Sequence, residues 1–296
     1  MNPSFVRPRF DLAWKDLAGR KRVLKLGRET RLMGVLNVTP DSFYDGGRYL
    51  DIAQAVDRAK ELEAEGADII DVGGESSRPG AEPVAAKEEL RRVIPVIEKL
   101  AGKIRVPISI DTSKAVVARE ALKAGAEIIN DISSLRFDPG MAEVAAAAPG
   151  PVILMHLRGR LGRMPSRPRY RDVVGEIMDF FALRLAALGR MGIAGERTIL
   201  DPGLGFGKSV KHNLLIIAGL KRMAALGRPL MLGPSRKSFI GRILGAPPEE
   251  RLWGTAGAAA VAVANGAHIL RVHDPQPIRE AARVVDKMME AAQTNG

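Results

Sequence analysis

Eight short apolar runs recur along the chain, and a segment with helical spacing of its apolar residues follows each run. The runs lie at 32–36, 68–72, 106–110, 127–130, 152–155, 198–200, 230–232 and 268–272. Strands that alternate with helices of this length favour right-handed βαβ units and a parallel sheet. Eight such units predict an α/β fold, a single-domain closed (β/α)8 barrel rather than an open doubly wound sheet.

The first 30 residues precede the first core strand and form a separate N-terminal extension. A short alternating stretch at 23–27 is predicted as a strand, in a hairpin that covers the lower end of the barrel. The barrel then occupies 31–296, which suits a fold that commonly uses about 250 residues as one domain. With 46% hydrophobic residues, the chain has enough apolar material for a sizeable core.

Start and stop signals mark several of the helices. Asp51 is predicted to cap the first helix, which ends at Gly66. Pro95 lies within the second, at 87–100, and predicts a kink or a restart. Further helices are predicted at 173–190, 213–226, 255–264 and 278–292.

Composition excludes several classes of protein. The absence of cysteine rules out disulfides and thiolate metal sites. No apolar run approaches the roughly 20 residues that span a bilayer, and no apolar core follows the N-terminal charges as in a secretory signal. We therefore expect a cytoplasmic protein with no membrane partner.

The net charge of +11 is spread along the chain, with no tract of five successive basic residues. The densest region, 158–171, mixes six arginines with Gly, Pro and Ser. This pattern favours a solvated surface around an anion-using site over a nucleic-acid partner.

Three predicted strand-to-helix loops, at 39–50, 73–86 and 157–171, are longer than usual. In a parallel barrel such loops lie on the catalytic rim, where long loops serve as lids or binding loops. Tolerated insertion is the alternative for each loop taken alone.

Two of these loops begin with residues suited to anions or cations. Asn37 ends the first core strand and enters a glycine-closed loop, which suits a hard cation or a phosphate, or else a plain capped turn. The second loop, at 73–80, has three glycines that let backbone amides approach an anion, and Ser77 and Arg78 add a hydroxyl and a charge.

Polar residues at strand ends form a second group: Asp111, Asn130, Asp131 and Asp201. Carboxylates in such places are costly unless paired or bound to a ligand. A carboxylate can accept two parallel hydrogen bonds from an amidine-like N–H face, such as that of a pterin ring. A structural capping role is an equally weighted alternative for Asp131.

A third group follows the seventh and eighth strands, where barrels frequently bind phosphate. Lys237 and Arg271 supply cations, and His273 stands two residues after the arginine, which favours ligand binding over a structural role. Met155 offers a packing surface for a flat ring, while the role of His156 stays open. The glycine-rich segment 201–208 fits neither a Walker loop nor a dinucleotide fingerprint.

Taken in order, these blocks resemble the dihydropteroate synthase family over about residues 30–285. The matching blocks are MGVLNVTPDSF, GGESSRPG, SIDT, NDI, DPGLGFGK, SRKSF and RVH. The resemblance implies a TIM barrel, a homodimer, and condensation of a pterin-methyl pyrophosphate with 4-aminobenzoate. It also implies inhibition by sulfonamides, which mimic aminobenzoate.

The resemblance further implies a role for individual residues. The expected catalytic residues are Asp111, Lys237, Arg271 and His273. The expected pterin ligands are Asp111, Asn130, Met155, Asp201, Phe206 and Lys237. The expected pyrophosphate ligands are Asn37, Ser77, Arg78, Arg271 and His273, with Mg²⁺ bound at Asn37. The expected aminobenzoate ligands are Phe43, Pro79 and Ser235.

The chain departs from the family pattern at Ser77, where threonine is common, and at Tyr44 and Pro234. None of these changes removes a catalytic group. Two alternatives stay open: a methyltetrahydrofolate-dependent methyltransferase, which needs no pyrophosphate site, and a non-catalytic pterin-binding paralogue, expected to lose loop residues such as Asn37 and Phe43.

Overall fold

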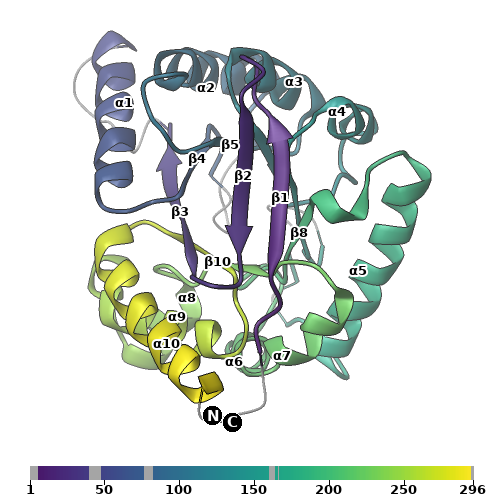
Figure 1. Ribbon diagram of the computed structural model, residues 1–296, viewed down its shortest axis with the longest axis vertical. Helices are drawn as coiled ribbons and strands as arrows, with labels where there is room; N and C mark the ends of the chain where they lie inside the picture. Colours follow the sequence, from purple (N-terminus) through teal and green to yellow (C-terminus); the bar gives the residue numbers. More distant parts are fainter. Residues whose placement is uncertain (1–5, 40–47, 77–82, 160–163, 166, 295–296) are drawn as a thin grey trace.

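The protein is a barrel of eight parallel strands, as the sequence predicted (Figure 1). The computed structural model describes residues 6–39, 48–76, 83–159, 164–165 and 167–294. The barrel strands are β3 (Arg31–Asn37), β4 (Ile69–Gly73), β5 (Ile108–Asp111), β6 (Ile128–Asp131), β7 (Val152–Met155), β8 (Thr198–Asp201), β9 (Met231–Leu232) and β10 (Ile269–Val272). A parallel bridge from Leu200 to Leu230 joins β8 to β9 and closes the ring.

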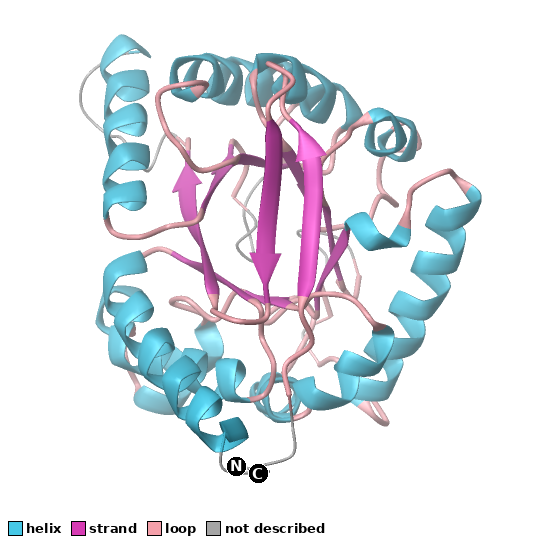
Figure 2. Ribbon diagram, viewed as in Figure 1, coloured by secondary structure: helices cyan, strands magenta, loops and turns pink. Residues whose placement is uncertain are grey.

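Helices surround this ring on the outside (Figure 2). They are α1 (Arg48–Ala64), α2 (Ala86–Leu100), α3 (Ala115–Ala124), α4 (Met141–Ala147), α5 (Val173–Arg190), α6 (Val210–Ala218), α7 (Leu220–Met223), α8 (Ser238–Leu244), α9 (Leu252–Ala264) and α10 (Pro275–Thr294). None of the helices in the described ranges is both long and apolar enough to cross a membrane.

Two of the helix predictions were wrong in detail, and one of two alternatives at Pro95 is excluded. Asp51 does not cap the first helix, because α1 begins one turn earlier, at Arg48, in a stretch without helix breakers. Pro95 causes no restart, since α2 runs through it. The sixth helix starts at Val210 rather than 213, where Ser209 and His212 form a capping box, and it ends before Gly219.

The N-terminal extension forms an antiparallel hairpin of β1 (Phe10–Lys15) and β2 (Lys21–Leu26). Its apolar side chains, led by Trp14 and Leu26, pack on inward-facing residues near the N-terminal ends of the barrel strands. In Figures 1 and 2 the hairpin crosses one mouth of the barrel. Arg7 ties the extension to the last helix, because it donates to Asp286 at 2.7 Å and to the Ala267 carbonyl at 2.8 Å.

The barrel interior changes from apolar to polar within one step along the strands. The apolar floor consists of Met33, Ile69, Ile128, Ile153, Ile199, Met231 and Ile269. Side chains alternate along a strand, so the residue two positions further on points to the same interior. Those positions hold Val35, Asp71, Asn130, Met155, Asp201, Gly233 and Arg271. The fold therefore places four polar side chains, Asp71, Asn130, Asp201 and Arg271, directly above an apolar floor, toward the C-terminal rim.

Candidate active site

A narrow pocket opens at the C-terminal end of the strands. Its lining consists of Asp111, Asn130, Ile132, Met155, Asp201, Leu204, Phe206, Gly233, Lys237 and Arg271. All six residues that the sequence assigned to a pterin ring are among them. These six residues come from four strands and from the segments after β8 and β9, so only the closed barrel brings them together.

Arg271 lies at the centre of this pocket, between two carboxylates. Its Nε donates to Asp71 Oδ2 at 2.6 Å, and its Nη2 donates to Asp111 Oδ2 at 2.7 Å. Burial lowers the pKa of Arg271, but the two carboxylates more than offset this and raise it above the usual range. Arg271 is therefore a fixed cation that is ion-paired with both carboxylates.

Asp111 and Lys237 face the same space with opposite charges. Burial raises the pKa of Asp111, while the Arg271 guanidinium opposes that shift. Burial and the nearby Arg271 lower the pKa of Lys237 to about 8. The Lys237 ammonium lies 4.4 Å from the centre of the Phe206 ring, a cation–π distance.

Asp201 ends β8 and is held by the loop that follows. Its Oδ1 accepts from the Gly203 amide at 2.7 Å, which leaves Oδ2 without a hydrogen bond to the described residues. Gly203 has φ of +71°, and a Cβ there would lie 2.1 Å from the His156 carbonyl oxygen, so only glycine fits. Burial raises the pKa of Asp201.

Lys208, which no prediction singled out, stabilises the same loop. Its buried ammonium donates to the carbonyl oxygens of His156 at 3.1 Å and Phe206 at 3.0 Å. Burial lowers the pKa of Lys208 to about 7. A lysine that closes a glycine-rich segment is a signal that the sequence offered, although it does not tell a structural lysine from a ligand-binding one.

Asp131 has the structural role that the sequence left as an alternative. Its carboxylate accepts from the Ser133 amide at 2.7 Å, the Ser133 hydroxyl at 3.0 Å and the Leu135 amide at 2.9 Å. Burial raises the pKa of Asp131 to about 6, although these hydrogen bonds lower it. Asp131 shapes the turn after β6 and does not line the pocket.

His156 also faces away from the pocket. Its ring packs edge-on against Phe180 at 5.0 Å, and burial together with nearby Lys208 and Arg136 lowers its pKa to about 2. The ring is therefore neutral and belongs to an aromatic cluster behind β7.

Ser235 and His273 come together at the rim beside the pocket. The Ser235 hydroxyl oxygen lies 2.9 Å from His273 Nδ1 and accepts from the His273 amide at 3.2 Å. Burial, with Arg271 and Arg236 nearby, lowers the pKa of His273 to about 3. Arg236 is engaged by Asp274, to which it donates at 2.6 and 3.1 Å. The rim thus holds a neutral imidazole rather than an imidazolium.

Asn37 ends β3 on the same rim, with its side chain half-buried. It forms no side-chain hydrogen bond with the described part of the chain, so its amide oxygen is available to a ligand. Mg²⁺ usually takes one or two protein oxygens and completes its shell with waters and substrate phosphates. Among the described residues there is no group of three His, Cys, Asp or Glu that could hold a metal ion. A Mg²⁺ carried mainly by a diphosphate fits this donor set, whereas an all-protein cage does not.

Four predicted ligands, Phe43, Ser77, Arg78 and Pro79, lie outside the described residues. The residues on either side of positions 77–82 of the second loop are described, and hydrogen bonds connect them to neighbouring elements. Glu75 accepts from the Val84 amide at 3.0 Å and from Lys114 at 2.5 Å, and Lys114 also donates to buried Glu89 at 2.5 Å. This Glu75–Lys114–Glu89 bridge joins both ends of the loop to α2.

Asp71, two residues before the glycine-rich loop at 73–80, is a residue to which the sequence analysis gave no role. It is fully buried and bonds to both Asn130 and Arg271. The signal that could have found it was the one applied to Asp111 and Asp201, namely a carboxylate among apolar strand residues.

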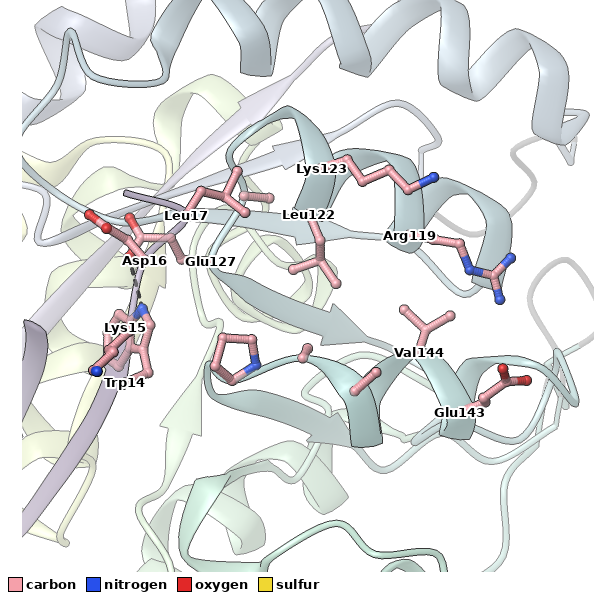
Figure 3. Close-up of a pocket in the computed structure, with 14 residues that line it drawn as sticks. Trp14, Lys15, Asp16, Leu17, Arg119, Leu122, Lys123, Glu127, Glu143 and Val144 are labelled. Atoms are coloured by element: carbon pink, nitrogen blue, oxygen red, sulfur yellow. Dashed lines mark hydrogen bonds between the residues drawn. The ribbon is translucent and has the colours of Figure 1, made fainter. Parts of the chain in front are cut away.

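An apolar hollow at the opposite end of the barrel lies far along the strands from these residues (Figure 3). Trp14 lines it and donates to Glu127, which directly precedes β6, at 2.8 Å; Leu122 and Val144 lie across from them. None of the candidate site residues lines this hollow.

Comparison with known proteins agrees with this geometry. Residues 33–273 match the model of the pterin binding enzyme family. The dihydropteroate synthase of Escherichia coli is 49% identical over 260 residues, which cover 88% of this chain and 92% of that protein. The chain belongs to the dihydropteroate synthase family.

Solved structures of dihydropteroate synthases superpose closely on the chain. The Yersinia pestis enzyme, solved with a sulfonamide drug, has a TM-score of 0.85 at 44% identity and covers 90% of this chain and 97% of its own. The Xanthomonas albilineans enzyme, solved with 4-aminobenzoic acid, has a TM-score of 0.85 at 43% identity, with coverage of 95% and 98%. Membership of the dihydropteroate synthase family leaves the methyltransferase alternative without support.

Proposed function

We infer that this chain condenses 6-hydroxymethyl-7,8-dihydropterin pyrophosphate with 4-aminobenzoate, and that it releases 7,8-dihydropteroate and pyrophosphate. The convergence of Asp111, Asn130, Asp201 and Lys237 on one pocket carries this proposal. Three of these side chains offer oxygen acceptors, and a pterin ring carries amino and ring N–H donors. Met155 and Phe206 supply apolar surfaces against which the flat pterin ring would pack.

The diphosphate would bind at the rim above the pterin. Asn37, the neutral His273 and the free nitrogen of Arg271, Nη1, are the described groups that reach this region, and Ser77 and Arg78 would join them. Donors aimed at the oxygen on which charge develops accelerate departure of the leaving group. When bound at Asn37, Mg²⁺ would neutralise part of the diphosphate charge.

The bond changes need no covalent protein intermediate. The carbon–oxygen bond of the methylene group breaks, and its electron pair leaves with pyrophosphate. The cation that remains is conjugated with the pterin ring, and the carboxylates of Asp111 and Asp201 lie in the same pocket to stabilise it. The aniline nitrogen then forms the new carbon–nitrogen bond and gives up a proton to solvent. Phe43, Pro79 and Ser235 would form the aminobenzoate site.

Measurement of pyrophosphate release from the pterin substrate tests this proposal directly. We expect Mg²⁺-dependent release, with dihydropteroate as the product when 4-aminobenzoate is present. Sulfonamides should compete with 4-aminobenzoate. Pterin binding without any release of pyrophosphate would overturn the proposal in favour of a non-catalytic paralogue, and a trapped covalent protein adduct would overturn the dissociative route.

We also propose that two copies of the chain form a homodimer through α6, α8 and α9. An apolar groove lies between these helices, and Leu214, Ile243, Leu244 and Val261 beside it are each about half exposed, at 47%, 54%, 54% and 50%. Contiguous apolar surface of this kind commonly marks an interface. A second copy with the same surface would cover it by two-fold symmetry.

Light scattering of the purified protein tests the dimer. The wild-type chain should have twice its sequence mass, and Ile243→Glu should halve it. Leu183→Glu is the matched control, because Leu183 is 74% exposed on α5, away from the groove. A wild-type monomer would contradict the proposal. The cytoplasmic location predicted from the sequence stays a prediction.

A further inference from the structure

Asp71 lies directly behind the pterin pocket and does not line it. Its side chain is fully buried on β4. One oxygen, Oδ2, accepts from Asn130 Nδ2 at 3.0 Å and from Arg271 Nε at 2.6 Å. A single atom out of reach of any ligand in the pocket thus contacts two residues that line it.

The contact with Arg271 shows whether Asp71 Oδ2 donates or accepts hydrogen bonds. A guanidinium only donates hydrogen bonds, so Asp71 Oδ2 is an acceptor. A second group that bonds to the same atom must also donate. Asn130 is therefore required to turn its NH2 group toward Asp71, and its carbonyl oxygen, Oδ1, is left on the pocket side.

We propose that Asp71 is a positioning residue that sets the specificity of the pocket, because it fixes Asn130 as a hydrogen-bond acceptor toward the ligand. The inference rests on the proposed pterin site and adds the rule by which that site selects its ring. With Asn130 fixed, the pocket offers acceptors from Asp111, Asn130 and Asp201. Such a surface favours a ring with amino and N–H donors and disfavours one with a carbonyl in place of the amino group.

The substitution Asp71→Leu isolates this effect, since leucine has a similar size and removes the acceptor atom to which Asn130 donates. Asn130 is then free to rotate and to offer a donor to the pocket. The variant also removes a negative charge beside Arg271, which weakens the binding of every ligand. The ratio of two affinities separates these effects, because general loosening lowers both affinities alike.

Ser109 supplies a matched control. It is the register partner of Asp71 on β5, is fully buried, and its hydroxyl has no partner in the described structure. Ser109→Ala removes a polar atom at the same depth of the barrel without a contact to Asn130. We expect this variant to keep the wild-type ratio, because loss of an unpaired buried hydroxyl is nearly neutral.

The experiment is isothermal titration of the full-length protein with 6-hydroxymethylpterin and with 6-hydroxymethyllumazine, which carries an oxo group in place of the 2-amino group. The wild-type protein should prefer the pterin, and Asp71→Leu should lower that preference at least about tenfold. An unchanged ratio in Asp71→Leu would overturn the inference while the proposed function stands. Failure of the wild-type protein to bind the pterin would overturn both.

Neutron diffraction of the wild-type protein with bound 6-hydroxymethylpterin gives a second test that does not depend on folding of a variant. It distinguishes nitrogen from oxygen in an amide, which X-ray data at ordinary resolution do not. Deuterons on the Asn130 atom that faces Asp71 would support the inference. Deuterons on the atom that faces the ring would overturn it.

Discussion

The Ser235 hydroxyl holds the imidazole ring of His273 in place. Its oxygen accepts from the His273 amide at 3.2 Å and lies 2.9 Å from His273 Nδ1, within hydrogen-bond distance. The low pKa keeps the ring neutral, so the ring carries one N–H group throughout the physiological pH range. When Ser235 donates to Nδ1, that group is Nε2–H, which can donate to a diphosphate.

We expect Ser235→Ala to lower kcat about fivefold to tenfold at saturating 4-aminobenzoate, since loss of one hydrogen bond costs about 1 kcal/mol. Steady-state rates of pyrophosphate release measure this. Ser238→Ala is the control, because Ser238 is exposed at the start of α8. An unchanged kcat in Ser235→Ala would show that the hydrogen bond between Ser235 and His273 does not matter to the reaction.

Asp201→Asn should weaken pterin binding by about 10- to 100-fold, the range expected for loss of a charged acceptor worth roughly 1.5–3 kcal/mol. Calorimetric titration with the pterin measures the loss. Asp131→Asn is the paired variant: it should lower the melting temperature, because Asp131 accepts three hydrogen bonds in a turn, and leave pterin affinity nearly unchanged. Equal effects of both variants on affinity would refute the assignment of Asp201.

Pterin affinity should fall as the pH rises through about 8, because Lys237 carries its charge below that pH and loses it above. Binding isotherms from pH 6.5 to 9.5 would show the transition. Lys237→Met, titrated with the same ligand, is the control for ionisation of the pterin itself. Its affinity should lack the part of the pH dependence that Lys237 causes. If both proteins have the same profile, Lys237 does not titrate in this range.

Lys114→Met should destabilise the fold by about 3–5 kcal/mol, because it leaves the buried carboxylate of Glu89 without its cation. Urea unfolding gives the free energy. Lys123→Met changes an exposed lysine and should stay within about 0.5 kcal/mol of wild type. A variant at position 114 as stable as wild type would mean that the Glu75–Lys114–Glu89 bridge contributes nothing to stability.

Strand positions were predictable because apolar runs that alternate with helices leave few other topologies. The ends of β7 and β8 were nearly fixed by the polar residues that follow them, which is why Asp201 and Met155 could be placed in one pocket. Helix starts were less predictable, since the cap at Ser209 depends on a reciprocal contact with His212 that spacing alone does not reveal.

Contacts between side chains on segments far apart in the chain could not be predicted from the sequence. Asp71 and Arg271 are 200 positions apart, and their pairing appears only when β10 closes against β3. The bond between Ser235 and His273 likewise depends on the loops after β9 and β10 lying side by side. Residue type identified these groups as polar and well placed, but only the fold shows which of them hold one another.

The hairpin that lies across the N-terminal end of the barrel leaves ligands access only from the C-terminal rim. With Leu12, Trp14, Leu24 and Leu26 packed against the floor, the pocket is closed at its lower end and open at the rim. We therefore expect the group that binds deepest to bind first and to dissociate last. A pterin that contacts Met155 and Asp201 is expected to bind before 4-aminobenzoate, and to leave as part of the product or after 4-aminobenzoate has dissociated.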